Sequence, residues 1–270
     1  MIITTIGRKT NNSLEAFGQF WMFCLRTTRW MFTGMFQYRN WRLVMPQLYE
    51  VGNRSLPVIA ITGTFVGMVL AVQAYDQLHA AGFAERMGVL LNLTLVQELG
   101  PVLAAVMLAG RVGGALTAEL GTMNVTEQID ALRAMGSDPI RYLVVPRFLA
   151  CLILCPVLTL FADVCGSVAG SWIAVGLKDI PYEPYSYYTM DAVAKWDMGV
   201  GFIKSLIFGW IIGMVACYKG FHCRAGAEGV GRACTEAFVA TFIAILIVDF
   251  FIASFSTGLY KVLYGFKSLV

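Results

Sequence analysis

Residues 56–75 read LPVIAITGTFVGMVLAVQAY and contain no charged side chain. A helix needs about 20 predominantly apolar residues to cross the ~30 Å hydrocarbon core of a bilayer. This stretch therefore predicts a transmembrane helix and indicates that the fold is that of a membrane protein.

The composition of the 270 residues agrees with that prediction. Hydrophobic residues make up 58% and charged residues 14%, with a mean hydropathy of +0.68. Soluble domains carry about 25% charged residues. The composition therefore indicates an integral membrane protein. The net charge of +3 is small and no run of Lys and Arg occurs, so we do not expect nucleic acid as a partner.

The seven cysteines lie mostly in or beside apolar segments, and no Cys-x-x-Cys pair or His cluster accompanies them. We therefore expect neither a zinc or other metal site nor a disulfide framework. The N-terminus has no apolar core followed by a small-residue cleavage site, so we expect the first span to direct insertion itself.

Four further stretches have the length and composition of spans. The third is too short for two spans and a turn at ~1.5 Å per residue, so we expect one long or tilted helix there. The predicted fold is an all-α integral membrane protein with five spans at residues 56–75, 87–108, 142–175, 202–217 and 237–260.

Lys and Arg side chains are concentrated before span 1 and in the loops between spans 2 and 3 and between spans 4 and 5. By the positive-inside rule, this asymmetry predicts a cytoplasmic N-terminus and a periplasmic C-terminus. We divide the chain into a cytoplasmic N-terminal segment at 1–54, one transmembrane domain at 55–260 and a short periplasmic tail at 261–270.

Residues 13–45 carry apolar and aromatic side chains at helical spacing, interrupted by Arg26, Arg29 and Arg39. Trp and Phe together with Arg are typical of a helix that lies in the membrane interface. The alternative is a soluble helix packed on another subunit.

Residues 127–147, EQIDALRAMGSDPIRYLVVPR, form a polar island between spans 2 and 3. We expect a short helix at 125–135, with Asn124 as its N-cap and Glu127 completing a capping box. Gly136 suits the left-handed position after such a helix. Asp138 and Pro139 suit the first positions of the next one. A plain structured loop is the alternative.

Several motifs follow one another along the chain: FVGMVL at 65–70, ELGPV at 98–102, AGRVGGALTAE at 109–119, EQIDAL at 127–132, and the pairs Asp138-Pro139 and Pro146-Arg147. In this order they resemble the MlaE (YrbE-type) permease family, the membrane subunits of bacterial ABC transporters of the Mce lipid-transport systems.

The resemblance implies a homodimer in the bacterial inner membrane that pairs with a cytoplasmic ATPase dimer and a small STAS-domain protein. It also implies a periplasmic MCE-domain hexamer and phospholipid as cargo, in a system that maintains outer-membrane lipid asymmetry. The helix at 125–135 would then dock on the ATPase, with Glu127, Asp130, Leu132 and Arg133 as contacts. Because this chain has no Gly-x-x-x-x-Gly-Lys-[Ser/Thr] motif, we expect it to be no enzyme and to hold no cofactor, with ATP and Mg²⁺ in the partner.

Three charged residues, Glu98, Lys204 and Asp249, fall inside predicted spans 2, 4 and 5, with Lys204 near one end of span 4. A charge at the bilayer centre costs about 2.5–3.5 kcal/mol on insertion scales and usually pairs or faces a cavity. We expect the three to cluster inside the bundle, as a structural pairing, a headgroup contact or a proton relay. Asp163 in span 3 is a weaker case of the same kind.

The outer end of span 1 combines apolar and polar side chains, as a path for lipid tails and headgroup requires. The candidates are Leu70, Gln73, Ala74, Tyr75 and Leu78, and ordinary packing is the alternative. The tyrosines at 182–188 are typical of interface anchors or of a contact with an outer partner. The second candidate function is an ion-coupled secondary transporter, although no inverted repeat is evident.

Overall fold

The computed structural model describes residues 2–34 and 38–264, and within these residues every regular element is a helix. Five helical segments are long and apolar enough to cross a membrane: Trp41–Ala80, Ala84–Val125, Ile140–Leu177, Lys195–Phe221 and Ala227–Leu263. The predicted all-α membrane fold with five spans is confirmed, including the single long helix for span 3.

The helices α1 and α2 are Ile2–Gly34 and Tyr38–Ala80. Span 2 consists of α3, α4 and α5 at Met87–Thr94, Gly100–Leu108 and Gly114–Val125, joined by π-helical turns at Leu95–Leu99 and Ala109–Gly113. Span 3 consists of α7 at Val145–Ser171 between π-helical turns at Ile140–Val144 and Trp172–Leu177. Spans 4 and 5 are α9 at Lys195–Phe221 and α10 at Ala227–Tyr264. The short helices α6 and α8 are Gln128–Ala134 and Tyr182–Ala192.

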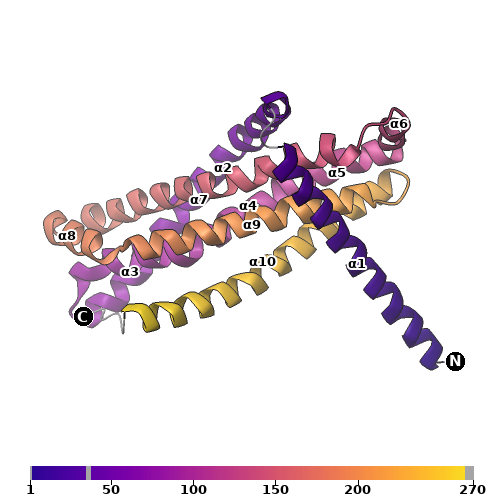
Figure 1. Cartoon of the computed structure of the whole chain (residues 1–270). Coiled ribbons are helices and arrows are strands. Elements are labelled where there is room, and N and C mark those ends of the chain that lie inside the picture. Colours follow the sequence, from indigo (N-terminus) through magenta and orange to yellow (C-terminus); the bar gives the residue numbers. More distant parts are fainter. Residues whose placement is uncertain (1, 35–37, 265–270) are drawn as a thin grey trace.

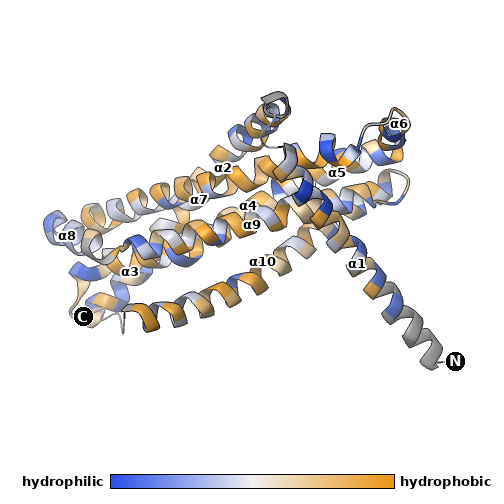
Figure 2. Cartoon of the chain, in the orientation of Figure 1, coloured by the Kyte–Doolittle hydropathy of each residue, from blue (hydrophilic) through white to orange (hydrophobic). Residues whose placement is uncertain are grey.

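The spans lie side by side as an elongated bundle, with α6 at one end and α8 at the other (Figure 1). Apolar residues dominate the middle of the bundle, whereas polar residues gather toward both ends (Figure 2). The helix α1 crosses the bundle obliquely and extends away from it toward the N-terminus (Figure 1). This distribution is the one expected for a chain whose middle zone is solvated by hydrocarbon.

The helices are longer than the apolar stretches that revealed them. The helix of span 1 begins at Tyr38 instead of 56, and span 2 continues through Arg111 to Val125 instead of ending at 108. Hydropathy locates the part of a helix that lies in hydrocarbon, whereas polar extensions are held by local pairs such as Glu50–Arg54 at 2.9 Å. The predicted loop between spans 3 and 4 contains a helix that the sequence did not indicate, α8.

Glycine permits the closest approach in the bundle, between α2 and α7. A Cβ atom at Gly63 would lie 2.7 Å from the carbonyl oxygen of Ala162, and one at Gly67 would collide with the backbone of Gly166. Small residues let transmembrane helices pack backbone to backbone. Gly63 and Gly67 of span 1 thus lie directly against the backbone of span 3, whereas a Cβ atom at Gly114 would meet nothing within 4 Å.

The inner face of α1 packs on the α6 end of the bundle. Phe23, Cys24 and Thr27 are buried there, and Phe20 and Phe23 contact the ring of Tyr218 edge to face, with centroids 5.1 and 5.6 Å apart. The other face of α1 leaves large apolar side chains exposed: Leu14, Phe17, Trp21, Met22 and Leu25. This exposed apolar face agrees with the predicted interfacial position, which stays a prediction.

Candidate functional site

The helix α6 and its neighbours form the first candidate site, at the end of the bundle where spans 2 and 3 meet. The predicted N-cap is wrong, because α5 continues through Asn124 to Val125 and the side chain of Asn124 instead lies 3.4 Å from the carbonyl oxygen of Cys223. The N-cap is Glu127, which has a left-handed φ of 59°. The chain therefore turns sharply at Glu127, and α6 begins at Gln128 rather than at 125.

One apolar residue anchors α6 while its charges stay in solvent. Ile129 is 1% exposed and Leu132 is half-buried, whereas Glu127, Asp130 and Arg133 are exposed. Arg133 donates to Asp130 across one turn at 2.7 Å. The four predicted coupling residues thus lie on or beside one short helix, and three of them present charge outward.

The end of α6 follows the predicted pattern. Gly136 has a left-handed φ of 74°, and its N–H and that of Ser137 donate to the carbonyls of Arg133 and Leu132 at 3.0 and 3.1 Å. Asp138 then caps the next helix by accepting from the N–H of Ile140 at 3.0 Å. Its second carboxylate oxygen accepts from the indole N–H of Trp30 at 2.9 Å, so α1 is tied to the same connection.

An ion pair at this end, between buried Arg147 and exposed Glu119, joins span 3 to span 2. Arg147 is 5% exposed and donates from Nη2 and Nε to the two carboxylate oxygens of Glu119, at 2.5 and 3.3 Å. A third donor, Nη1, reaches the carbonyl of Leu143 at 2.8 Å. Sequence reasoning noted both residues inside motifs but did not pair them, because residues 28 positions apart meet only through the tertiary fold.

The second candidate site is the intramembrane charge cluster. The structure brings the three predicted residues together, with Nζ of Lys204 lying 2.5 Å from Glu98 Oε2 and 2.9 Å from Asp249 Oδ1. Lys204 is fully buried, and because α9 begins at Lys195 it lies well inside its helix rather than near an end as predicted. Glu98 lies in the π-helical turn Leu95–Leu99, just before Pro101. Such turns occur often at functional sites.

The five lipid-path candidates on α2 differ in their surroundings. Ala74 is buried in a cluster with Tyr75 and Leu78, packed against α3 and the end of span 3. Tyr75 also carries Lys178 Nζ over its ring at 4.3 Å. Leu70 is half-buried and Gln73 is exposed. Within one chain, Ala74, Tyr75 and Leu78 therefore take part in packing between helices, and Gln73 lies on the surface.

A cavity of about 330 Å³ opens between α7 and α9 toward α8, lined by Asp163 among other residues. Asp163 is 8% exposed, and its Oδ1 has no hydrogen-bond partner among the described residues. The sequence marked Asp163 only as an intramembrane charge. The tyrosine-rich helix α8 covers this end, where burial raises the pKa of Tyr185 and its hydroxyl lies 3.2 Å from that of Ser171.

Known proteins resemble this chain over most of its length. A probable ABC transporter permease protein of Rickettsia bellii is 38% identical over 251 residues, 93% of this chain and 96% of that protein. A probable ABC transporter permease protein of Synechocystis is 41% identical over 79% of this chain and 81% of its own length. The intermembrane phospholipid transport system permease protein MlaE of Haemophilus influenzae is 34% identical over 82% and 85%. Since the model of the family described as Permease MlaE also matches residues 44–255, the chain belongs to the MlaE permease family.

Proposed function

We propose that this chain is the permease subunit of an ABC transporter that moves phospholipids between the inner membrane and periplasmic carriers. Five apolar spans and the family membership support a multi-pass permease. The named phospholipid transport of the Haemophilus relative supports the cargo. Such transport would maintain the lipid asymmetry of the outer membrane.

The observation that carries the proposal is α6. A seven-residue helix at the end of two spans exposes Glu127, Asp130 and Arg133 and is held to the bundle by buried Ile129. Exposed charge on a rigidly anchored helix suits a reversible contact with a soluble protein, because charged surfaces steer association. The chain has no phosphate-binding loop of its own. A cytoplasmic ATPase dimer holding ATP and Mg²⁺ is the partner that we assign to α6.

The assembly that we propose has two copies of this chain. The helix α10 supports it, because its apolar residues Phe250, Phe251 and Phe255 are about two-thirds or more exposed. The distribution of Lys and Arg supports a cytoplasmic α6 and a periplasmic α8. A STAS-domain protein on the cytoplasmic side and an MCE-domain hexamer on the periplasmic side complete the proposed complex.

The charge cluster and the outer end of α2 take supporting roles in this proposal. Lys204 is paired with two acids, which favours a structural clasp between spans 2, 4 and 5. Gln73 and Leu70 remain candidates for a lipid path that forms between two subunits. An ion-coupled secondary transporter would instead need these acids to exchange their bound cation during transport.

The test is reconstitution. The protein is purified with its native partners and placed in vesicles that contain fluorescent phospholipid, and movement of the lipid to an acceptor carrier is followed with and without ATP. We expect ATP-dependent movement that stops when the ATPase is lost. Movement driven by an ion gradient in the absence of any ATPase would overturn the proposal in favour of the secondary transporter.

A further inference from the structure

The cavity beside Asp163 has the features of a ligand site that none of the proposed roles uses. Its volume of about 330 Å³ falls in the range of small-molecule pockets, which are mostly apolar with a few convergent polar groups. It lies between α7 and α9, with Asn92 and Val96 of span 2 and Thr189 of α8 also in its lining. This places it apart from the candidates on α2.

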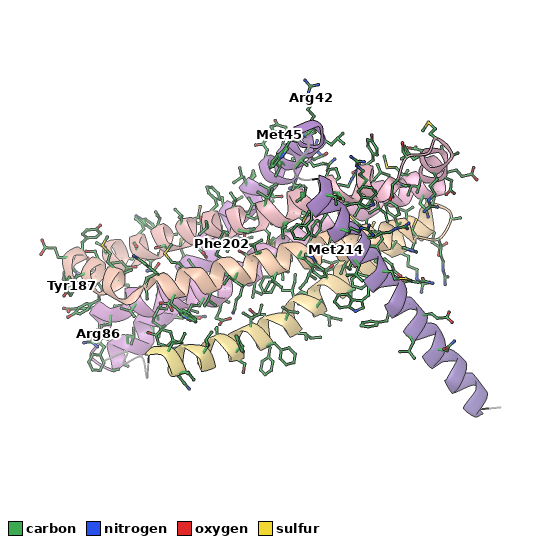
Figure 3. All side chains as sticks on the ribbon, viewed as in Figure 1. Arg42, Met45, Arg86, Tyr187, Phe202 and Met214 are labelled. Atoms are coloured by element: carbon green, nitrogen blue, oxygen red, sulfur yellow. The ribbon has the colours of Figure 1, made fainter. Side chains whose placement is uncertain are left out.

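The rim of the cavity is open and apolar. Val164 and Val168 on α7 are 59% and 66% exposed, and Met198 and Phe202 on α9 are 51% and 46% exposed. Figure 3 shows Phe202 on α9, in the part of the helix nearer to α8. Because this part of the bundle lies in the apolar zone, lipid chains can enter the groove from the side.

Four polar side chains of the cavity already donate a proton to the backbone and keep acceptor lone pairs. The hydroxyls of Thr159, Thr189 and Ser205 donate to backbone carbonyls at 2.9, 2.7 and 2.8 Å. The amide nitrogen of Asn92 donates to the carbonyl of Gly88 at 2.9 Å. The free lone pairs of these side chains therefore call for a hydrogen-bond donor from a ligand.

Asp163 adds a buried carboxyl group. A carboxyl group buried in a membrane needs a cationic or hydrogen-bonding partner, yet its Oδ1 has none among the residues that the structure describes. Oδ1 lies against Gly100 of span 2, since a Cβ atom at that position would collide with it, and Asp163 is also one of the residues that line the cavity. The site thus combines an acid, several acceptors and an open apolar rim.

We infer that this cavity binds a lipid whose head group carries a primary ammonium, with a hydrocarbon chain lying along the rim between α7 and α9. A primary ammonium supplies a positive charge and three N–H donors, which match the acid and the acceptors. The inference deepens the proposed function and rests on it for a role in transport, since it names the class of lipid that the permease selects.

Equilibrium binding tests the inference without transport. Native mass spectrometry of the detergent-solubilised protein would measure the affinities of dioleoyl phosphatidylethanolamine and of dioleoyl phosphatidylcholine. The two lipids share their chains and net charge, but only the first has N–H donors. We expect the ethanolamine lipid to bind about tenfold more tightly, the effect of one charge-assisted hydrogen bond.

Two substitutions in the cavity and one control make the test specific. Asp163→Asn keeps the shape of the side chain and should reduce the preference to less than about twofold. Ser167→Phe should fill the groove and weaken the binding of both lipids. The control is Asp76→Asn, which changes an acid that is 68% exposed outside the cavity and should keep the preference. Thermal unfolding of each variant would show that it is folded.

Equal affinity of the unsubstituted protein for the two lipids would overturn the inference, as would an unchanged preference in Asp163→Asn. A second copy of the chain seated over the rim would leave lipid binding insensitive to both cavity substitutions, and that result would overturn it as well. A protein that keeps the preference but moves no lipid with ATP would contradict the proposed function alone. A protein that transports lipid without any preference would contradict this inference alone.

Discussion

The Nζ atom of Lys204 lies 2.5 Å from Oε2 of Glu98, although the two residues are 106 positions apart and belong to different spans. The same Nζ atom lies 2.9 Å from Oδ1 of Asp249. Because Lys204 is fully buried, replacing it with Met leaves two acids inside the bundle without their cation. We expect Lys204→Met to lower the free energy of unfolding by about 3 kcal/mol, measured by denaturation in mixed micelles.

A matched control for this substitution is Arg54→Met, which removes a cation from an exposed pair at 68% and 56% side-chain exposure. That change should cost less than about 1 kcal/mol. The double variant Glu98→Lys with Lys204→Glu tests whether the two residues interact directly, and it should recover part of what each single change loses. Equal stability of the Met variant and the unsubstituted protein would contradict the clasp.

The bidentate pair of Arg147 and Glu119 leads to a second prediction. Arg147 uses three donors at once, and the single ammonium of Lys cannot reproduce this fork. We expect Arg147→Lys to be destabilising by about 1–3 kcal/mol, since the buried side chain at 147 would no longer reach all three of its acceptors. Differential scanning fluorimetry would measure it beside Arg133→Lys, an exposed change that should be neutral. A neutral Arg147→Lys would show that charge alone suffices.

The number and order of the spans could be predicted because they depend on local composition. Residues 56–75 have no charge, and a helix in the hydrocarbon core must consist mainly of such uncharged, apolar residues. The positions of the helix ends could not be predicted in the same way. Arg111 reads as a loop residue, yet its Nη1 lies 2.6 Å from the hydroxyl of Ser55, a partner that only the fold supplies.

In the candidate sites, too, the features that depend on neighbouring residues could be predicted, whereas those that depend on the tertiary fold could not. Gly136 and Asp138 act at short range, and both behave as the sequence indicated. Asn124 has the spacing of a capping box in the sequence, but in the structure α5 continues through it and its side chain contacts Cys223 in the loop between spans 4 and 5. Asp163 looked like a minor intramembrane charge, because neither its cavity nor the absence of a described partner for Oδ1 is visible in a linear sequence.

The glycine contact between spans 1 and 3 gives a third prediction. A methyl group at Gly67 collides with the backbone of Gly166, which cannot rotate away. We expect Gly67→Ala to separate the two helices and to cost about 1–3 kcal/mol. The matched control is Gly114→Ala, which meets nothing within 4 Å and should stabilise its helix by about 0.5–1 kcal/mol. Unfolding of the two variants under the same conditions should give opposite signs, and equal signs would contradict the close contact.

The last prediction concerns α6. Reversing the charges of Glu127, Asp130 and Arg133 together should leave the free energy of unfolding within about 0.5 kcal/mol, because all three side chains are exposed. The same variant should lose most of the ATP-driven lipid movement while the partner ATPase still hydrolyses ATP. Ile129→Ala is the contrasting variant, since it removes the buried anchor and should cost about 2–5 kcal/mol of stability. Reconstituted vesicles would report ATP hydrolysis and lipid movement in parallel. Normal transport by the charge-reversed variant would mean that α6 only connects spans 2 and 3 and that the ATPase docks elsewhere.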